Sequence, residues 1–186
     1  MARGYSAAMP RRQTFPDLWL LSDERNDAAL EDALRRLPRG SGFIYRHYHL
    51  SDAERAARWF DLVQIVRRRG HVAILADSSL TAREWGADGI YGAPRALYPA
   101  ANDLLMLATA HNLADIGRAN RMRADAVLLS PAFPTCSHPG AQVLGPLRFR
   151  LHAAHARMPV IALGGMNALT ARRLDWQRWA AIDGLS

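Results

Sequence analysis

Two loops of this chain carry residue types that could bind a phosphate ester. The apolar run over residues 124–129 opens into a loop, residues 130–140, which contains prolines, serines, a threonine and a histidine. A second apolar run, residues 160–163, ends in Gly164 and Gly165. Two glycines let backbone N–H groups approach an anion closely, because no side chain stands in the way. Together the loops predict part of a phosphate-ester pocket, although the glycines could instead serve only a tight turn.

A histidine stands where it could move a proton. His111 follows the apolar run over residues 104–108, two positions after Thr109. An imidazole with an ordinary pKa of roughly 6.5 takes up and returns a proton at neutral pH, as general acid–base catalysis requires. His111 could equally be an ordinary residue at the start of a helix, hydrogen-bonded to solvent.

The elements that must position these residues are short apolar runs alternating with amphipathic stretches. Continuous apolar runs, rather than alternating ones, favour strands covered on both faces. The predicted strands are residues 18–22, 43–47, 72–76, 89–91, 104–108, 126–129, 160–163 and 179–182. Helices are predicted over residues 26–37, 79–85, 111–121, 146–157 and 167–174, with a further helix opened by a capping box from Ser51 to Glu54.

Eight strands separated by helices within 186 residues predict an α/β fold, a compact (β/α)8 TIM barrel. An open doubly wound sheet would more often have a glycine-rich first turn, and residues 21–25 contain no glycine. Residues 1–16 are predicted to be a flexible N-terminal arm and residues 17–186 a single barrel domain. The last strand lies so near Ser186 that the final helix is expected to be reduced or absent. Either the barrel is left uncovered on that side, or the N-terminal arm or a partner subunit of a possible homodimer covers it.

In such a barrel the chemistry is expected at the carboxyl ends of the strands. Position alone therefore nominates a set of candidate residues: Ser22, Asp23, Arg46, His47, Asp77, Tyr91, Thr109, His111, residues 130–138, Gly164, Gly165 and Asp183.

All 24 basic residues are arginine, which excludes a Schiff-base lysine and a P-loop lysine. The net charge of +7 raises the question of nucleic acid. The arginines, however, are spread over the chain, most of them on predicted outer helix faces, and they lack interleaved aromatic residues. We therefore expect solvated helix faces and a small anionic substrate, not a nucleic acid.

The remaining composition narrows the class of protein further. No run approaches the roughly 18 apolar residues that span a bilayer, and the first twelve residues lack the apolar core of a secretory signal, so we expect a cytoplasmic protein without a membrane partner. The single Cys136 excludes an intramolecular disulfide and is most simply a small residue of its loop.

The loop and the glycine pair resemble those of thiamine phosphate synthase and its relative TenI, the thiazole tautomerase. Thr135, Ser137 and His138 follow that family's Pro-Thr-x-Thr-Lys loop, and Arg46 matches an arginine on its second strand. The resemblance implies that His111 and Arg46 are catalytic. It further implies a substrate-binding set of Thr109, Thr135, Ser137, His138, Gly164, Gly165 and Met166.

The chain departs from the synthase pattern where that enzyme handles magnesium and diphosphate. Asp77 matches the aspartate of an Asn-Asp pair, but Ala76 replaces the asparagine, and no carboxylate follows the fourth strand. His138 stands in place of the loop lysine. Asp77 is therefore a Mg²⁺ ligand only if the chain is a synthase, and otherwise a structural or helix-capping residue. Asp183 would repel a phosphate at the glycine loop unless it is paired or turned away.

The resemblance implies three alternative functions in thiamine biosynthesis, each with a small-molecule phosphate ester as partner. A TenI-like tautomerase would bind a thiazole phosphate, move a proton through His111 and require no cofactor. A true thiamine phosphate synthase would join a pyrimidine diphosphate to the thiazole phosphate, release diphosphate and require Mg²⁺. A non-catalytic barrel would only bind a thiamine precursor. Because the departures affect the synthase most, the sequence favours the tautomerase.

Overall fold

The computed structural model describes residues 15–135, 140 and 142–185. The strands are β1 (Leu18–Leu21), β2 (Gly42–Tyr45), β3 (Val72–Leu75), β4 (Gly89–Gly92), β5 (Leu105–Ala110), β6 (Ala126–Leu129), β7 (Val160–Ala162) and β8 (Trp179–Ala181). The α-helices are α1 (Leu30–Arg36), α2 (Asp52–Arg69), α3 (Ser79–Glu84), α4 (Leu113–Met122), α5 (Gly145–Ala153) and α6 (Ala168–Leu174). Two 3-10 helices, η1 (Glu24–Ala29) and η2 (Asp183–Leu185), follow β1 and β8.

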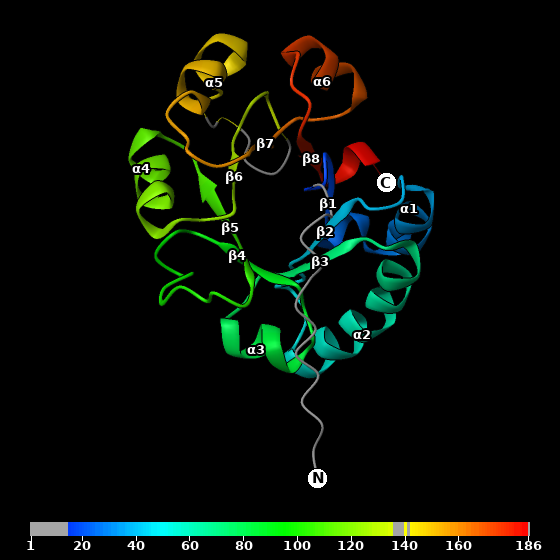
Figure 1. Ribbon diagram of the computed structural model, residues 1–186. Coiled ribbons are helices and arrows are strands. Elements are labelled where there is room, and N and C mark those ends of the chain that lie inside the picture. The colour runs from blue at the N-terminus through cyan, green and yellow to red at the C-terminus, as the bar shows by residue number, and fades with distance from the viewer. Residues whose placement is uncertain (1–14, 136–139, 141, 186) are drawn as a thin grey trace.

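The strands form a closed ring in chain order, and every neighbouring pair is parallel. The ring closes where β1 pairs with β8, with Leu18 opposite Trp179 and Leu20 opposite Ala181. Figure 1 shows β8 beside β1 and the helices around the outside. This arrangement confirms the predicted TIM barrel, and within the described residues β8 is followed only by η2.

The core consists of two layers because each strand is buried on both faces. One cluster holds strand residues and their immediate continuations, and it fills the barrel interior with side chains such as Trp19, Leu21, Ile44 and Ile74. The other cluster combines alternate strand residues with helix residues such as Trp59 and lies between barrel and helices. This two-sided burial explains why the strands appear in the sequence as continuous apolar runs.

Two of the predicted helices differ in the structure. The expected helix over residues 26–37 is divided into η1 and α1. Asn26 is buried in η1, and its side-chain amide donates to the carbonyls of Leu21 and Ile182, both at 3.0 Å. The expected helix from residue 111 begins instead at Leu113, because the Asn112 side chain accepts from the Asp115 amide at 3.0 Å. His111 is thus left in the loop before α4.

The two ends of the chain's described part lie against the barrel. Most of the predicted N-terminal arm, residues 1–14, lies outside the described residues. Its last two residues contact Trp19: the Phe15 ring lies 5.3 Å away between centroids, and the Pro16 carbonyl accepts from the indole N–H at 2.8 Å.

No helix in the described part of the chain is long and apolar enough to cross a membrane.

The packing of Trp19 leads to a stability prediction. Trp19 is fully buried inside the barrel, and a Cβ at Gly42 on the neighbouring strand would overlap its ring. We expect Gly42→Ala to lower the free energy of unfolding by about 1–3 kcal/mol, because overpacking forces side chains off their preferred rotamers. Gly92→Ala is the matched control, since a Cβ there meets its nearest atoms at 3.7 Å. Urea denaturation measures both, and equal midpoints for the two variants would contradict this account.

Candidate active site

A cavity of about 780 Å³ lies at the carboxyl ends of the strands. Seven residues predicted from the sequence line it: Arg46, Thr109, His111, Thr135, Gly164, Gly165 and Met166. Ser137 and His138 lie outside the described residues. Tyr91, Ser130 and Asp183, nominated only by position at strand ends, also line the cavity, whereas Asp77 does not. The fold therefore brings together residues from β2, β5, β7 and the loop after β6.

The glycine loop after β7 lines this cavity. Gly164 and Gly165 have φ values of 89° and 63°, a region of backbone conformation that residues with a side chain rarely adopt. A Cβ at Gly164 would come within 2.7 Å of the Pro131 Cα, and one at Gly165 would overlap the Pro134 carbonyl. Within the described residues, no protein acceptor takes the N–H groups of Gly164, Gly165 or Met166. The loop is consequently held close to its neighbour while its amides stay available for an anion.

The first turn of α6 offers fewer free amides for binding an anion than its position beside the glycine loop suggests. The Asn167 side chain caps this helix, and it accepts from the amides of Leu169 and Thr170, both at 2.9 Å. Those two amides are satisfied by the protein. These two amides are therefore not offered to an anion in the cavity, whereas those of the glycine loop are.

The orientation of His111 fixes which ring nitrogen can act. Its Nδ1 lies 3.0 Å from the backbone carbonyl oxygen of Ser130. A carbonyl only accepts hydrogen bonds, so in the neutral imidazole Nδ1 carries the proton and Nε2 has the free lone pair. His111 is exposed and lines the cavity, which makes Nε2 the nitrogen available to a ligand.

Arg46 is held in place before any ligand arrives. Its Nε donates to the Ser22 carbonyl at 2.9 Å and its Nη2 to the Asp23 carboxylate at 2.6 Å. Arg46 lines the cavity together with Tyr91. Burial raises the pKa of Tyr91 to about 12, against the opposing positive charge of Arg46. Tyr91 thus keeps its proton at neutral pH and remains a hydrogen-bond donor on the wall.

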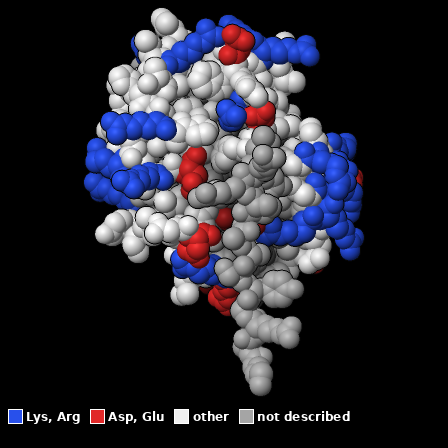
Figure 2. All heavy atoms as spheres, in the orientation of Figure 1, with Lys and Arg blue, Asp and Glu red and all other residues white. Residues whose placement is uncertain are grey.

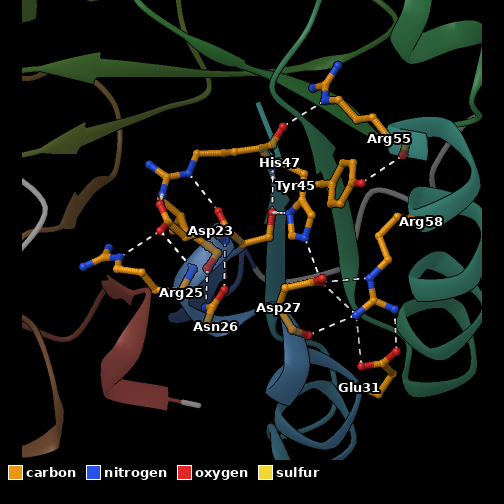
Figure 3. Close-up of polar contacts among 12 residues, drawn as sticks. Asp23, Arg25, Asn26, Asp27, Glu31, Tyr45, His47, Arg55 and Arg58 are labelled. Carbon is orange, nitrogen blue, oxygen red and sulfur yellow. Dashed lines mark hydrogen bonds and ion pairs between the residues drawn. The ribbon is translucent and has the colours of Figure 1, made fainter. Parts of the chain in front are cut away.

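Arg25, which the sequence did not single out, connects two carboxylates at the edge of the cavity. Its Nε lies 2.8 Å from Asp23 and its Nη1 3.2 Å from Asp183. Figure 3 shows Arg25 directed toward Asp23 beside the end of β1. Burial raises the pKa of Asp23, but hydrogen bonds from Arg25 and the charges of Arg46 and Arg25 outweigh it, so the net shift is downward. Asp183, expected to repel a phosphate unless paired, is therefore paired.

Ser22, His47 and Asp27 form a hydrogen-bonded chain next to Arg46. His47 Nδ1 lies 2.8 Å from the Ser22 hydroxyl. Its Nε2 lies 2.8 Å from the Asp27 carboxylate (Figure 3). Ser22 has no exposed surface, and its hydroxyl accepts from the Arg46 amide at 2.8 Å. No substrate can reach that oxygen, so the hydrogen-bonded chain positions the Arg46 backbone and does not form a nucleophile.

Two arginines of α2 correct the expectation that helix arginines face solvent. Arg55 is only 7% exposed, and it donates to the Arg46 carbonyl at 2.9 Å, the Ala76 carbonyl at 3.0 Å and the Asp77 carboxylate. Arg58 bridges Asp27 and Glu31 (Figure 3). This face of α2 lies against strand ends, where unpaired carbonyls and carboxylates require donors. Elsewhere, Figure 2 shows the arginines in separate groups on the surface.

The surroundings of Asp77 do not fit a magnesium site. One carboxylate oxygen pairs with Arg55, and the other accepts from the Ser78 amide at 2.6 Å. Burial raises the pKa of Asp77, but the hydrogen bonds from Arg55, Ser78 and Thr81 outweigh this effect, so the net shift is downward. Among the residues that the structure describes, no three His, Cys, Asp or Glu side chains gather in a way that could hold a metal ion. Asp77 serves as the anchor of Arg55.

The burial of His47 predicts how stability changes with pH. Burial lowers the pKa of His47 despite the hydrogen bond and charge of Asp27. The unfolded chain then binds a proton at a higher pH than the folded protein, so this contribution is complete above about pH 6.5 and is lost as the pH falls. We expect His47→Asn to reduce the slope of unfolding free energy against pH by up to about 1.4 kcal/mol per unit below pH 6.5.

Urea denaturation between pH 7.5 and 5 would measure this slope. Asparagine is chosen because His47 has a φ of 39°, which asparagine tolerates. The exposed His155, changed in the same way, should leave the slope as it is in the wild type. An unchanged slope in His47→Asn would show that burial of this imidazole does not govern the pH dependence.

Comparisons with known proteins agree on one family. A family model described as thiamine monophosphate synthase matches residues 18–180. A thiamine-phosphate synthase of Chloroflexus aurantiacus is 30% identical over 148 residues, which cover 76% of this chain and 67% of that protein.

Solved structures show the same fold. A thiamine phosphate pyrophosphorylase from Pyrococcus furiosus has a TM-score of 0.76 at 22% identity, covering 91% of this chain and 87% of that one. The corresponding protein from Bacteroides thetaiotaomicron has a TM-score of 0.59 at 16% identity, covering 89% and 82%.

Proposed function

Since this chain belongs to the thiamine monophosphate synthase/TenI family of thiamine biosynthesis, we propose that it is a thiazole tautomerase like TenI. In this proposal a thiazole phosphate occupies the cavity and His111 shifts a proton of that ligand. The observation that carries the proposal is the imidazole of His111, whose Nδ1 bonds to the Ser130 carbonyl at 3.0 Å. Its basic nitrogen is thereby available beside a loop of unoccupied amides.

The phosphate binds at the glycine loop in this proposal. The amides of Gly164, Gly165 and Met166 are without protein acceptors in the described part of the chain and can donate to phosphate oxygens. Preorganised amides of this kind need no rearrangement when the ligand arrives. The thiazole ring then lies in the remainder of the cavity, between the glycine loop and the wall that carries Arg46 and Tyr91.

The proton transfer uses His111 as base and then as acid. Nε2 takes a proton from one carbon of the thiazole ring system and delivers a proton to another, so the ligand keeps its atoms and the imidazole returns to its first state. Negative charge develops on the ligand while the proton is on His111. Arg46, fixed by Ser22 and Asp23, provides a positive charge on the same cavity wall.

A true synthase is the second candidate, and the name of the Chloroflexus relative favours it. That reaction uses a pyrimidine diphosphate and, in the family, Mg²⁺. Here Asp77 is occupied by Arg55 and Ser78, and it does not line the cavity. We therefore rank the synthase below the tautomerase. A barrel that only binds the thiazole phosphate is the third possibility, and loss of turnover in a His111 variant separates it from the first.

His111→Ala tests the role of the imidazole. We expect the rate of thiazole tautomerisation to fall by about 100- to 10,000-fold, as is typical when a general base is removed. The dissociation constant for the thiazole phosphate should change little, because the phosphate is held by the glycine loop. His155→Ala, an exposed histidine outside the cavity, is the matched control. A wild-type protein that binds the ligand without turning it over would show a binder and not an enzyme.

Calorimetric titration with and without Mg²⁺ separates tautomerase from synthase. We expect the carboxythiazole phosphate to bind with the same affinity in 5 mM EDTA as in magnesium at about millimolar concentration, since the site for it contains amides and arginine but no metal ligands. The pyrimidine diphosphate should bind weakly in both buffers. Tight, magnesium-dependent binding of the diphosphate would instead establish the synthase.

A further inference from the structure

We propose that Arg25 is a positioning residue that neutralises Asp183 and thereby sets the affinity of the cavity for anionic ligands. The inference rests on the proposed function, because the anion in question is the phosphate of the thiazole ligand. It assigns a role to the turn after β1, which lies outside the family-like loops on which the proposed function depends.

Asp183 stands beside the proposed phosphate position. It lines the cavity, and the next residue, Gly184, packs against the turn that follows the glycine loop. A Cβ on Gly184 would overlap the Met166 carbonyl and come within 3.1 Å of the Asn167 Cβ. The turn after β8 is thus held tightly against the turn after β7. A charge on Asp183 therefore acts on any anion bound to the glycine amides.

Arg25 is held so that it offsets this charge. Asp23 fixes its Nε at 2.8 Å, and Nη1 then reaches Asp183 at 3.2 Å. Asp23 also pairs with Arg46 at 2.6 Å. The four side chains therefore form a row of alternating charge, from Arg46 through Asp23 and Arg25 to Asp183, and their charges sum to zero. The two end members, Arg46 and Asp183, line the cavity.

Removing single members of this row changes its net charge in opposite directions. Without the charge of Arg25 the row carries −1, and Asp183 is left to repel a phosphate dianion. Without the charge of Asp183 the row carries +1, and this net charge attracts the same ligand. Without both, the row is neutral again. Anion affinity should follow this net charge, whereas a purely structural role for Arg25 would give no such order.

The test is a double-mutant cycle with Arg25→Gln, Asp183→Asn and the double variant, each titrated calorimetrically with the carboxythiazole phosphate. We expect Arg25→Gln to weaken binding by about tenfold and Asp183→Asn to tighten it by about threefold. The double variant should return to within about twofold of the wild type. Arg83→Gln removes the same charge from an exposed pair with Asp103 and should leave affinity unchanged.

Two further titrations separate charge from structure. The thiazole alcohol that lacks both the phosphate and the carboxylate should bind all four proteins equally, because it carries no negative charge. At 0.5 M NaCl the effect of Arg25→Gln should shrink to about threefold or less, since salt screens charges near the surface. Failure of Asp183→Asn to restore binding in the Arg25→Gln protein would overturn the inference, because Arg25 would then act as a direct ligand or a structural support.

Failure of the proposed function would look different. If wild-type protein does not bind the thiazole phosphate, the cycle is repeated with inorganic phosphate as the probe. The same order of affinities for inorganic phosphate would support the role of Arg25 although the ligand assignment had failed. Equal affinities of the four proteins for inorganic phosphate would overturn the inference.

Discussion

The pairing of β1 with β8 holds the first and last strands of the ring side by side, and the arrangement of the cavity depends on it. Asn26 reinforces this junction, because its buried amide donates to the carbonyl of Leu21 at the end of β1 and to that of Ile182 after β8. Each bond satisfies a carbonyl at the end of its strand, where a buried C=O group requires a donor. With the two strand ends fixed together, Arg25 comes within reach of Asp183, although 157 residues separate them in the chain.

Arginine satisfies the strand ends of this barrel in a way that lysine could not. Each strand end leaves carbonyls, and Asp23, Asp27 and Asp77 add carboxylates to them. A guanidinium has five N–H donors in a rigid plane, so Arg55 can bond two carbonyls and a carboxylate at once. An ammonium has three donors and no fixed plane. This chain, which has no lysine, thus uses some of its arginines to satisfy buried carbonyls and carboxylates, and not only as solvated surface groups.

The buried arginines also determine which carboxylates are available at the site. The carboxylate of Asp77, which matches a family metal ligand in the sequence, is committed to Arg55 and to the Ser78 amide. The residues that line the cavity include the glycine pair, His111 and Arg46. Such a set suits the binding of one phosphate and the transfer of a proton.

The sequence by itself determined the barrel, the family and most of the residues around the cavity. Continuous apolar runs identify strands because a strand buried on both faces has apolar residues at successive positions. The ends of these strands then nominate His111, Gly164 and Gly165, and no knowledge of tertiary contacts is needed. The predicted helix starts are less accurate, because a cap such as that of Asn112 depends on the direction of one side chain.

Only the tertiary structure decided how the charges are paired. Asp183 is neutralised by Arg25, and Arg55 is buried against Asp77. The free nitrogen of His111 follows from the position of the Ser130 carbonyl. No local pattern encodes these pairs, because the partners lie 19 or more residues apart and meet only when closure of the ring sets the direction of each strand end.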